Sequence, residues 1–158
     1  MGNKSRRVTG ESEHNGNRRG APLLYLALAV SYTIGIYWLS TIPGDVDPAS
    51  PLLSGIIAWT PPALQNLLHV PLFGLLAWLW YRTLHAWNMH HGAALTIAFM
   101  LATGYGVFDE WHQLHIPGRY ASFTDIALNG TGVVLALWWV HRGERRRIQA
   151  QTDHRTTE

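Results

Sequence analysis

The amino-acid sequence predicts an all-α membrane protein, a four-transmembrane-helix bundle with both termini cytoplasmic. Three observations support this prediction. Four apolar segments each approach the length of about 20 residues that a helix needs to cross a bilayer. Polar sequence flanks these segments at both ends of the chain, and nearly all Lys and Arg residues fall on one side of the expected membrane. The mean hydropathy is close to zero only because the polar ends dilute the apolar segments.

Composition excludes several classes of function. A chain of 158 residues is expected to form one domain. Its net charge of +2 does not come from a basic patch among aromatic residues, so no nucleic-acid partner is predicted. The absence of cysteine excludes disulfides, thiol nucleophiles and cysteine metal sites. Histidine and carboxylates would have to carry any metal chemistry, and the cofactor stays unknown, with a divalent metal left open.

The chain begins with a polar segment and then turns apolar. Residues 1–20 are rich in Gly, Asn and charge, and we expect a disordered basic cytoplasmic tail. The first helix is expected over about 22–40, with Pro22 at its start, where a helix tolerates proline. A cleaved signal peptide is the alternative, but the apolar run continues to Leu39 and more apolar segments follow. An uncleaved transmembrane helix is therefore the better interpretation.

A proline-rich segment follows the first helix. It carries Asp45 and Asp47 but no Lys or Arg. Residues 52–59 within it are too few to span a membrane, so we expect an interfacial or re-entrant turn.

The second helix is expected over about 63–82. Pro71 interrupts it, because proline cannot donate the usual hydrogen bond to the carbonyl of Leu67. Neighbouring membrane helices can satisfy such a freed carbonyl. The polar connection after this helix contains His85, His90 and His91. These histidines resemble a metal site, but no carboxylate lies nearby in the sequence to complete it.

The third and fourth helices are expected over about 93–113 and 122–141. Trp138 and Trp139 are typical of the interfacial belt at the end of a span. Residues 142–158 then form a second basic, polar cytoplasmic tail. The membrane domain as a whole covers residues 21–141.

Charge sets the expected orientation. Of the 12 Lys and Arg residues, all except Arg119 lie before the first helix, between the second and third, or after the fourth. The cytoplasmic side of a membrane protein holds this excess. We therefore expect the loops after the first and third helices to face outward. The lipid bilayer is the predicted partner, and the oligomeric state is open.

Polar residues crowd into residues 104–129, close to the outer face. Such density within apolar sequence is costly and indicates a functional site. Residues three or four apart share a helix face. Asp125 is therefore expected on the same face as Asn129, and Glu110 on the same face as Gln113. His69 lies at a similar depth on the second helix, about 9 Å from its start. We expect these faces to converge on one polar cavity.

The charge of this cavity is unbalanced. Asp109 lies about 100° around the helix from Glu110, and with Asp125 the two make three carboxylates against one permanent cation, Arg119. Buried unpaired charge is disfavoured, so the acids must be solvated, protonated, or matched by His69, a metal ion or a cationic ligand. A purely structural alternative is that Asp125 pairs with Arg119.

The pattern of these residues resembles the VanZ-like family of membrane proteins. The match comprises DEWHQ at residues 109–113, PGR at 117–119 and SFTDIALNGTG at 122–132. Their order and spacing are similar to the family's acidic-acidic-x-x-Gln, Pro-Gly-Arg and Asp-x-x-x-Asn-x-x-Gly signature. His69 corresponds to a family histidine in the second helix, and Ser40 with Pro43 resembles the family's end of the first.

One departure concerns the mouth of the cavity. Gln65 and Asn66 stand where the family commonly has Asp-Lys, which removes a cation.

The resemblance implies a multi-pass protein of the bacterial cytoplasmic (inner) membrane. The family's namesake is linked to low-level resistance to the glycopeptide teicoplanin, and the resemblance implies no established reaction. A first hypothesis is cell-envelope chemistry on a lipid, lipid-linked wall precursor or glycopeptide ligand at the outer face. A second is a non-catalytic scaffold or binding partner of envelope machinery. The candidate catalytic residues are Glu110, Asp125 and His69, and the candidate substrate-binding residues are Arg119, Gln113, Asn129 and Asp109.

Overall fold

The computed structural model describes residues 6–43, 62–119 and 121–156, and these residues form four helices and no strand. The helices are α1 (Arg6–Ser40), α3 (Pro62–Ala86), α4 (His91–Gln113) and α5 (Phe123–Thr156). Each contains a stretch long and apolar enough to cross a membrane. The expected fold class, an all-α membrane protein with four spanning helices, is therefore confirmed.

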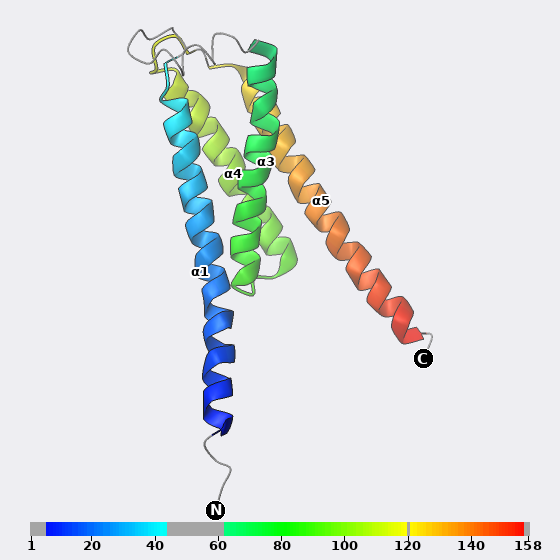
Figure 1. Cartoon of the computed structure of the whole chain (residues 1–158). Coiled ribbons are helices and arrows are strands. Elements are labelled where there is room, and N and C mark those ends of the chain that lie inside the picture. The colour runs from blue at the N-terminus through cyan, green and yellow to red at the C-terminus, as the bar shows by residue number, and fades with distance from the viewer. Residues whose placement is uncertain (1–5, 44–61, 120, 157–158) are drawn as a thin grey trace, which may run out of the picture.

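The other three helices pack around α3. It contacts all three of the others, whereas α1 and α5 do not touch within the described ranges. Figure 1 shows both termini at the end of the bundle that holds the α3–α4 turn. We call this the terminal end. The last residues of α1 and the α4–α5 loop lie at the opposite end, which we call the loop end.

Two helices extend beyond the expected spans. α1 begins at Arg6 rather than near residue 22, so Pro22 lies inside it, and α5 continues to Thr156 rather than ending near residue 141. The basic segments expected as a disordered tail and a polar tail are thus largely helical here. Helix propagation adds a hydrogen bond for each residue once a nucleus exists, so an apolar span can extend into polar sequence.

Two further expectations concern the segment between α1 and α3 and the course of α3 itself. The turn expected at residues 52–59 falls outside the described residues. The expected interruption at Pro71 is not found, because α3 passes through this proline as one continuous helix.

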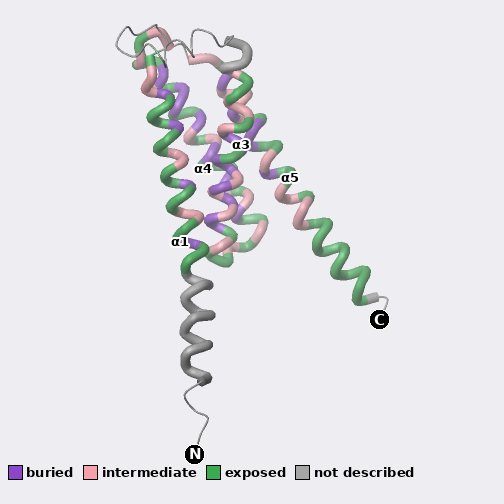
Figure 2. Tube along the Cα trace, in the orientation of Figure 1, coloured by how far each residue is buried: buried purple, intermediate pink, exposed green. Residues whose placement is uncertain are grey.

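Small side chains let the helices pack closely. On α4, Ala94, Ala98 and Ala102 recur every fourth residue and are fully buried. Phe73 and Leu76 of α3 fill the centre of the core. Figure 2 shows buried positions along the inward faces of α1, α3 and α4 and along the first half of α5, whereas the second half of α5 is largely exposed. Close packing of small residues is the usual basis of helix association in lipid.

The helices α3 and α5 approach each other closely at Gly132. A Cβ atom added to Gly132 would lie 2.1 Å from the backbone oxygen of Val70. One turn further along α3, a Cβ added to Gly74 would lie 3.1 Å from the backbone oxygen of Gly132. No side chain fits at the first of these positions, so glycine there sets the distance between the two helices.

We expect Gly132→Ala to destabilise the protein by about 1–3 kcal/mol, because the methyl group would push α5 away from α3. This strain outweighs the gain in helix propensity of about 1 kcal/mol from replacing glycine by alanine. The matched control is Gly130→Ala on the same helix, where an added Cβ meets nothing within 4 Å. Thermal unfolding in detergent tests this, and equal unfolding midpoints for the two variants would contradict it.

Candidate functional site

The expected polar site lies at the loop end of the bundle, where six polar or charged residues are buried. Asp109 and Glu110 are each 2% exposed, and Asn129 is 1% exposed. The six residues divide into two groups with different neighbours. The buried residues are Ser40, Asp109, Glu110, Gln113, Asp125 and Asn129.

The first group, which we call the α1–α4 cluster, contains Ser40, Asp109 and Gln113. The hydroxyl of Ser40 lies 2.5 Å from Oδ1 of Asp109 and donates to it. Nε2 of Gln113, one turn further along α4, donates to Oδ2 of Asp109 at 3.0 Å. Both oxygens of this buried carboxylate therefore have a hydrogen-bond donor, and the cluster fastens α4 to the end of α1.

The α1–α4 cluster corrects one part of the sequence analysis. Helical spacing grouped Gln113 with Glu110 and placed Asp109 away from them. The structure instead joins Gln113 to Asp109, which is four residues earlier on the same helix, and Asp109 also faces Ser40 of α1. The assignment of one inward face to α4 was wrong, because α4 contacts three other helices.

The second group, which we call the central cluster, contains His69, Glu110, Asp125 and Asn129. Nδ1 of His69 lies 2.9 Å from Oδ1 of Asn129 and 3.9 Å from Oε1 of Glu110. In the Nδ1-protonated tautomer, the ring donates to Asn129 and presents the same edge to the carboxylate. The structure thus brings residues of α3, α4 and α5 together, as the helical spacing predicts.

Packing between α4 and α5 puts Glu110 and Asp125 at the same level along the bundle. A Cβ added to Gly106 would lie 3.3 Å from Cβ of Asn129, so α4 and α5 meet at these positions. Glu110 follows Gly106 by one turn, and Asp125 precedes Asn129 by one turn. The two helices run in opposite directions (Figure 1). One turn along each helix from the Gly106–Asn129 contact therefore brings Glu110 and Asp125 to the same level.

Three buried atoms of the central cluster have no hydrogen-bond partner among the described residues. They are Oε1 of Glu110, Oδ1 of Asp125 and Nδ2 of Asn129. Most buried polar atoms in proteins are paired, and each exception calls for an explanation. Two acceptors and one donor beside an imidazole are suited to binding a polar group.

The start of α5 stabilises the acids. The backbone N–H of Ser122 donates to Oε2 of Glu110 at 3.2 Å, and Asp125 lies in the first helical turn. Ser122 also caps the helix, since its Oγ accepts from the N–H of Thr124. The amino end of a helix carries partial positive charge. We did not predict this contact from the sequence, although Ser122-x-x-Asp125 is similar to a capping-box pattern that marks such a helix start.

Arg119 does not supply the counter-charge. Its Nε donates to the backbone oxygen of Ile42 at 3.0 Å, and its Nη2 lies 3.4 Å from that of Leu39. Within the described ranges it forms no ion pair, so the pairing with Asp125 that the sequence left open is not found. Arg119 instead holds the carboxyl end of α1, whose carbonyls lack helical partners.

The start of α3 carries Gln65 and Asn66, the two residues that differ from the pattern expected at the mouth of the cavity. Asn66 is partly buried, and the side chain of Gln65 falls outside the described residues.

A pair of histidines, His91 and His141, lies at the terminal end. The hydroxyl of Tyr81 lies 3.0 Å from Nδ1 of His91, and Nε2 of His91 lies 3.1 Å from Nδ1 of His141. Sequence spacing suggested His85, His90 and His91 as a group, whereas the structure joins His91 to a residue of α5. No sequence signal links positions 91 and 141. Neither here nor elsewhere in the described ranges do three or more His, Asp or Glu residues form a group that could hold a metal ion.

Comparison with known families agrees with this arrangement. A family model described as VanZ/LLP1 matches residues 5–142. The chain belongs to the VanZ/LLP1 family. The matched range runs from α1 into α5 and includes the central cluster and the α1–α4 cluster of this VanZ/LLP1 protein. No curated protein and no solved structure matches the chain.

Ser40→Ala should lower the stability of this VanZ/LLP1 protein by about 1.5–3 kcal/mol, the usual contribution of a hydrogen bond to a charged group. The substitution leaves one oxygen of the buried Asp109 without its donor. Thr41→Ala is the matched control, because the hydroxyl of Thr41 donates to the backbone oxygen of Trp38 in an exposed hydrogen bond. Unfolding midpoints in detergent distinguish the two, and a Ser40 variant as stable as the Thr41 variant would count against the α1–α4 cluster as a fastening.

Proposed function

We propose that this VanZ/LLP1 protein works in the cell envelope, where its central cluster binds the polar part of a lipid or lipid-linked wall precursor and transfers a proton to or from it. One observation carries the proposal: buried atoms of Glu110, Asp125 and Asn129 beside His69 have no hydrogen-bond partner in the part of the chain that the structure describes. Ionisable groups inside a membrane bundle are expensive and tend to mark sites of function. A ligand would supply the missing hydrogen bonds.

The roles of the residues follow from their contacts. Acid–base catalysis requires a group that gives a proton and one that takes it, each within reach of the reacting atom. Glu110 and Asp125 are the proposed acid and base, because each has one oxygen with a free acceptor position. His69 is the proposed partner of Glu110, since its Nδ1 lies 3.9 Å from the free oxygen. Asn129 orients His69 and offers its Nδ2 to the ligand.

The remaining candidates position the site. Asp109 accepts from Ser40 of α1 and from Gln113 of its own helix, which holds α4 against α1 beside the neighbouring Glu110. Arg119 donates from Nε and Nη2 to carbonyls of α1, and the proposal assigns its other nitrogen, Nη1, to an anionic head group. Guanidinium groups suit phosphate, because they offer several donors in a fixed plane.

The proposal places the loop end on the outer side of a bacterial cytoplasmic (inner) membrane. The support is the distribution of charge: Lys and Arg residues gather at the termini and at Arg82, all of which belong to the terminal end. The cytoplasmic side of a membrane protein holds such an excess.

Single-cysteine labelling tests this orientation, since the chain has no cysteine of its own. His115→Cys, in the exposed α4–α5 loop, should react with a membrane-impermeant maleimide in intact cells. Trp87→Cys, in the exposed α3–α4 turn, should react only after the membrane is permeabilised. The reverse pattern would place the central cluster on the cytoplasmic side and would remove the proposed access to outer-leaflet substrates.

A second candidate function is a non-catalytic scaffold or binding partner of envelope machinery. The α1–α4 cluster favours this second candidate, because both carboxylate oxygens of Asp109 already accept hydrogen bonds within the protein. Polar contacts of this kind join membrane helices without any chemistry.

Variants of the central cluster distinguish the two candidates. We expect Glu110→Gln and Asp125→Asn to abolish function while the protein stays folded and abundant, because each keeps its shape but loses its acid. The matched control is Glu144→Gln, the same change on α5 at the terminal end. The measurement compares membrane lipids, lipid-linked wall precursors and glycopeptide susceptibility in cells that carry each variant in place of the wild type.

Two results would reject proton transfer by this cluster. One is a profile for both acid variants that equals wild type while deletion of the protein changes it. The other is a parallel loss of protein abundance and function, which is the result expected for a scaffold.

A further inference from the structure

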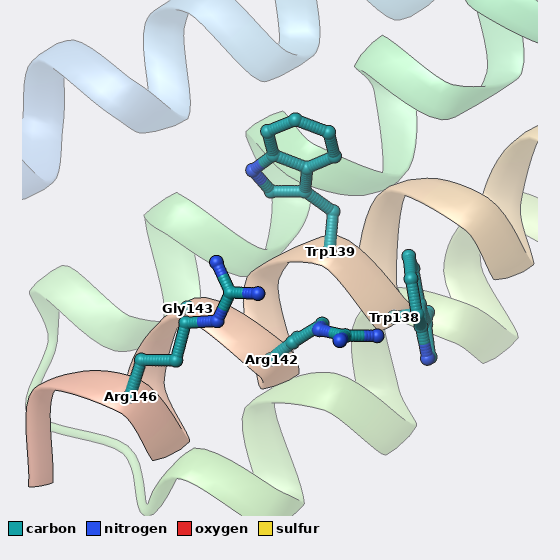
Figure 3. Close-up of a pocket in the computed structure, with 5 residues that line it drawn as sticks. All are labelled: Trp138, Trp139, Arg142, Gly143 and Arg146. Carbon is teal, nitrogen blue, oxygen red and sulfur yellow. The ribbon is translucent and has the colours of Figure 1, made fainter. Parts of the chain in front are cut away.

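A basic pocket lies on α5 at the terminal end, far along the helix from the central cluster. Figure 3 shows Trp138, Trp139, Arg142, Gly143 and Arg146 around it. The pocket has a volume of about 360 Å³. Trp138 and Trp139 are 52% and 76% exposed on the described surface, so neither is held in the protein core.

The charge of this pocket is uniformly positive. Arg142 and Arg146 are one turn apart on α5, and no carboxylate lines the pocket with them. Figure 3 shows both guanidinium groups directed back along the helix toward the tryptophans. The guanidinium carbon of Arg142 lies 5.1 Å from the ring centre of Trp138. Gly143 lies between the two arginines in the sequence. A Cβ added to Gly143 would meet nothing within 4 Å, so no described side chain fills the space beside it.

An apolar groove continues from this pocket toward the middle of the bundle. It runs between α3 and α5, has a volume of about 460 Å³, and is lined in part by Pro71, Leu75 and Leu135. Trp139 lines both the groove and the basic pocket. The close approach of α5 to α3 at Gly132 forms part of the groove wall. A positive pocket joined to an apolar groove matches a molecule with an anionic head and a hydrocarbon tail.

We propose that this combined surface binds one anionic phospholipid, with its phosphate between Arg142 and Arg146 and an acyl chain along the Leu75–Leu135 groove. The tryptophans lie where their amphipathic rings are favoured, at the boundary between head groups and hydrocarbon. The surface is separate from the central cluster and does not depend on the function proposed for it. A free phosphate ion would use the arginines but leave the groove empty.

The test reconstitutes the full chain in nanodiscs of phosphatidylcholine, with or without phosphatidylglycerol. Native mass spectrometry then measures the phosphatidylglycerol that stays bound to the released protein. We expect the double variant Arg142→Gln/Arg146→Gln to retain it about 30-fold more weakly, the effect of two basic groups near a lipid surface. The matched control is Arg145→Gln/Arg155→Gln, which removes the same charge from α5 outside the pocket.

Two further arms separate the sources of phosphate and control for folding. Leu135→Trp, which fills the exposed groove, should weaken lipid retention without removing charge, whereas added inorganic phosphate should not displace the lipid. Arg142→Lys/Arg146→Lys keeps the charge and should keep most of the binding, which shows that any loss in the glutamine variant is not a loss of fold. Equal retention by the glutamine variant and its control would overturn the proposal. Displacement by inorganic phosphate with no effect of Leu135→Trp would also overturn it.

Discussion

The close crossing of α3 and α5 at Gly132 is the constraint on which the site depends. Lipid gives helices no hydrophobic reason to associate, so the association rests on close packing and on polar contacts between helices. At Gly132 the backbone of α5 approaches the carbonyl of Val70 more closely than any side chain would allow. Asn129 precedes Gly132 by one turn, and His69 precedes Val70, so the same approach brings Asn129 within 2.9 Å of His69.

The buried acids are stabilised by different means in the two polar groups. Asp109 is matched by donors from side chains of α1 and α4, and its bonding is complete. Glu110 relies on a backbone N–H at the start of α5, and its second oxygen stays open toward His69. A helix start is a fixed dipole that needs no mobile cation. This arrangement leaves one oxygen each of Glu110 and Asp125 without a partner among the described residues, while Arg119 holds the end of α1.

The bundle separates opposite charges along its length. Buried carboxylates gather at the loop end, and exposed arginines with tryptophans gather on α5 at the terminal end. The exposed arginines meet solvent or head groups at little cost, whereas the buried acids need internal partners. The same bundle thus presents two chemically distinct surfaces: the buried acids come from α4 and α5, whereas the arginines and tryptophans of the basic pocket all lie on α5.

The sequence by itself determined the four spanning helices, because length and apolar character decide whether a segment crosses a membrane. It also predicted the convergence of His69, Glu110, Asp125 and Asn129, since helical periodicity places them on inward faces at similar depth. Only the tertiary structure decided that Ser40 bonds Asp109, that Arg119 holds α1, and that His91 meets His141. Those contacts depend on how each helix rotates and which neighbour it meets. Periodicity identifies the face of a helix but not the helix that it faces.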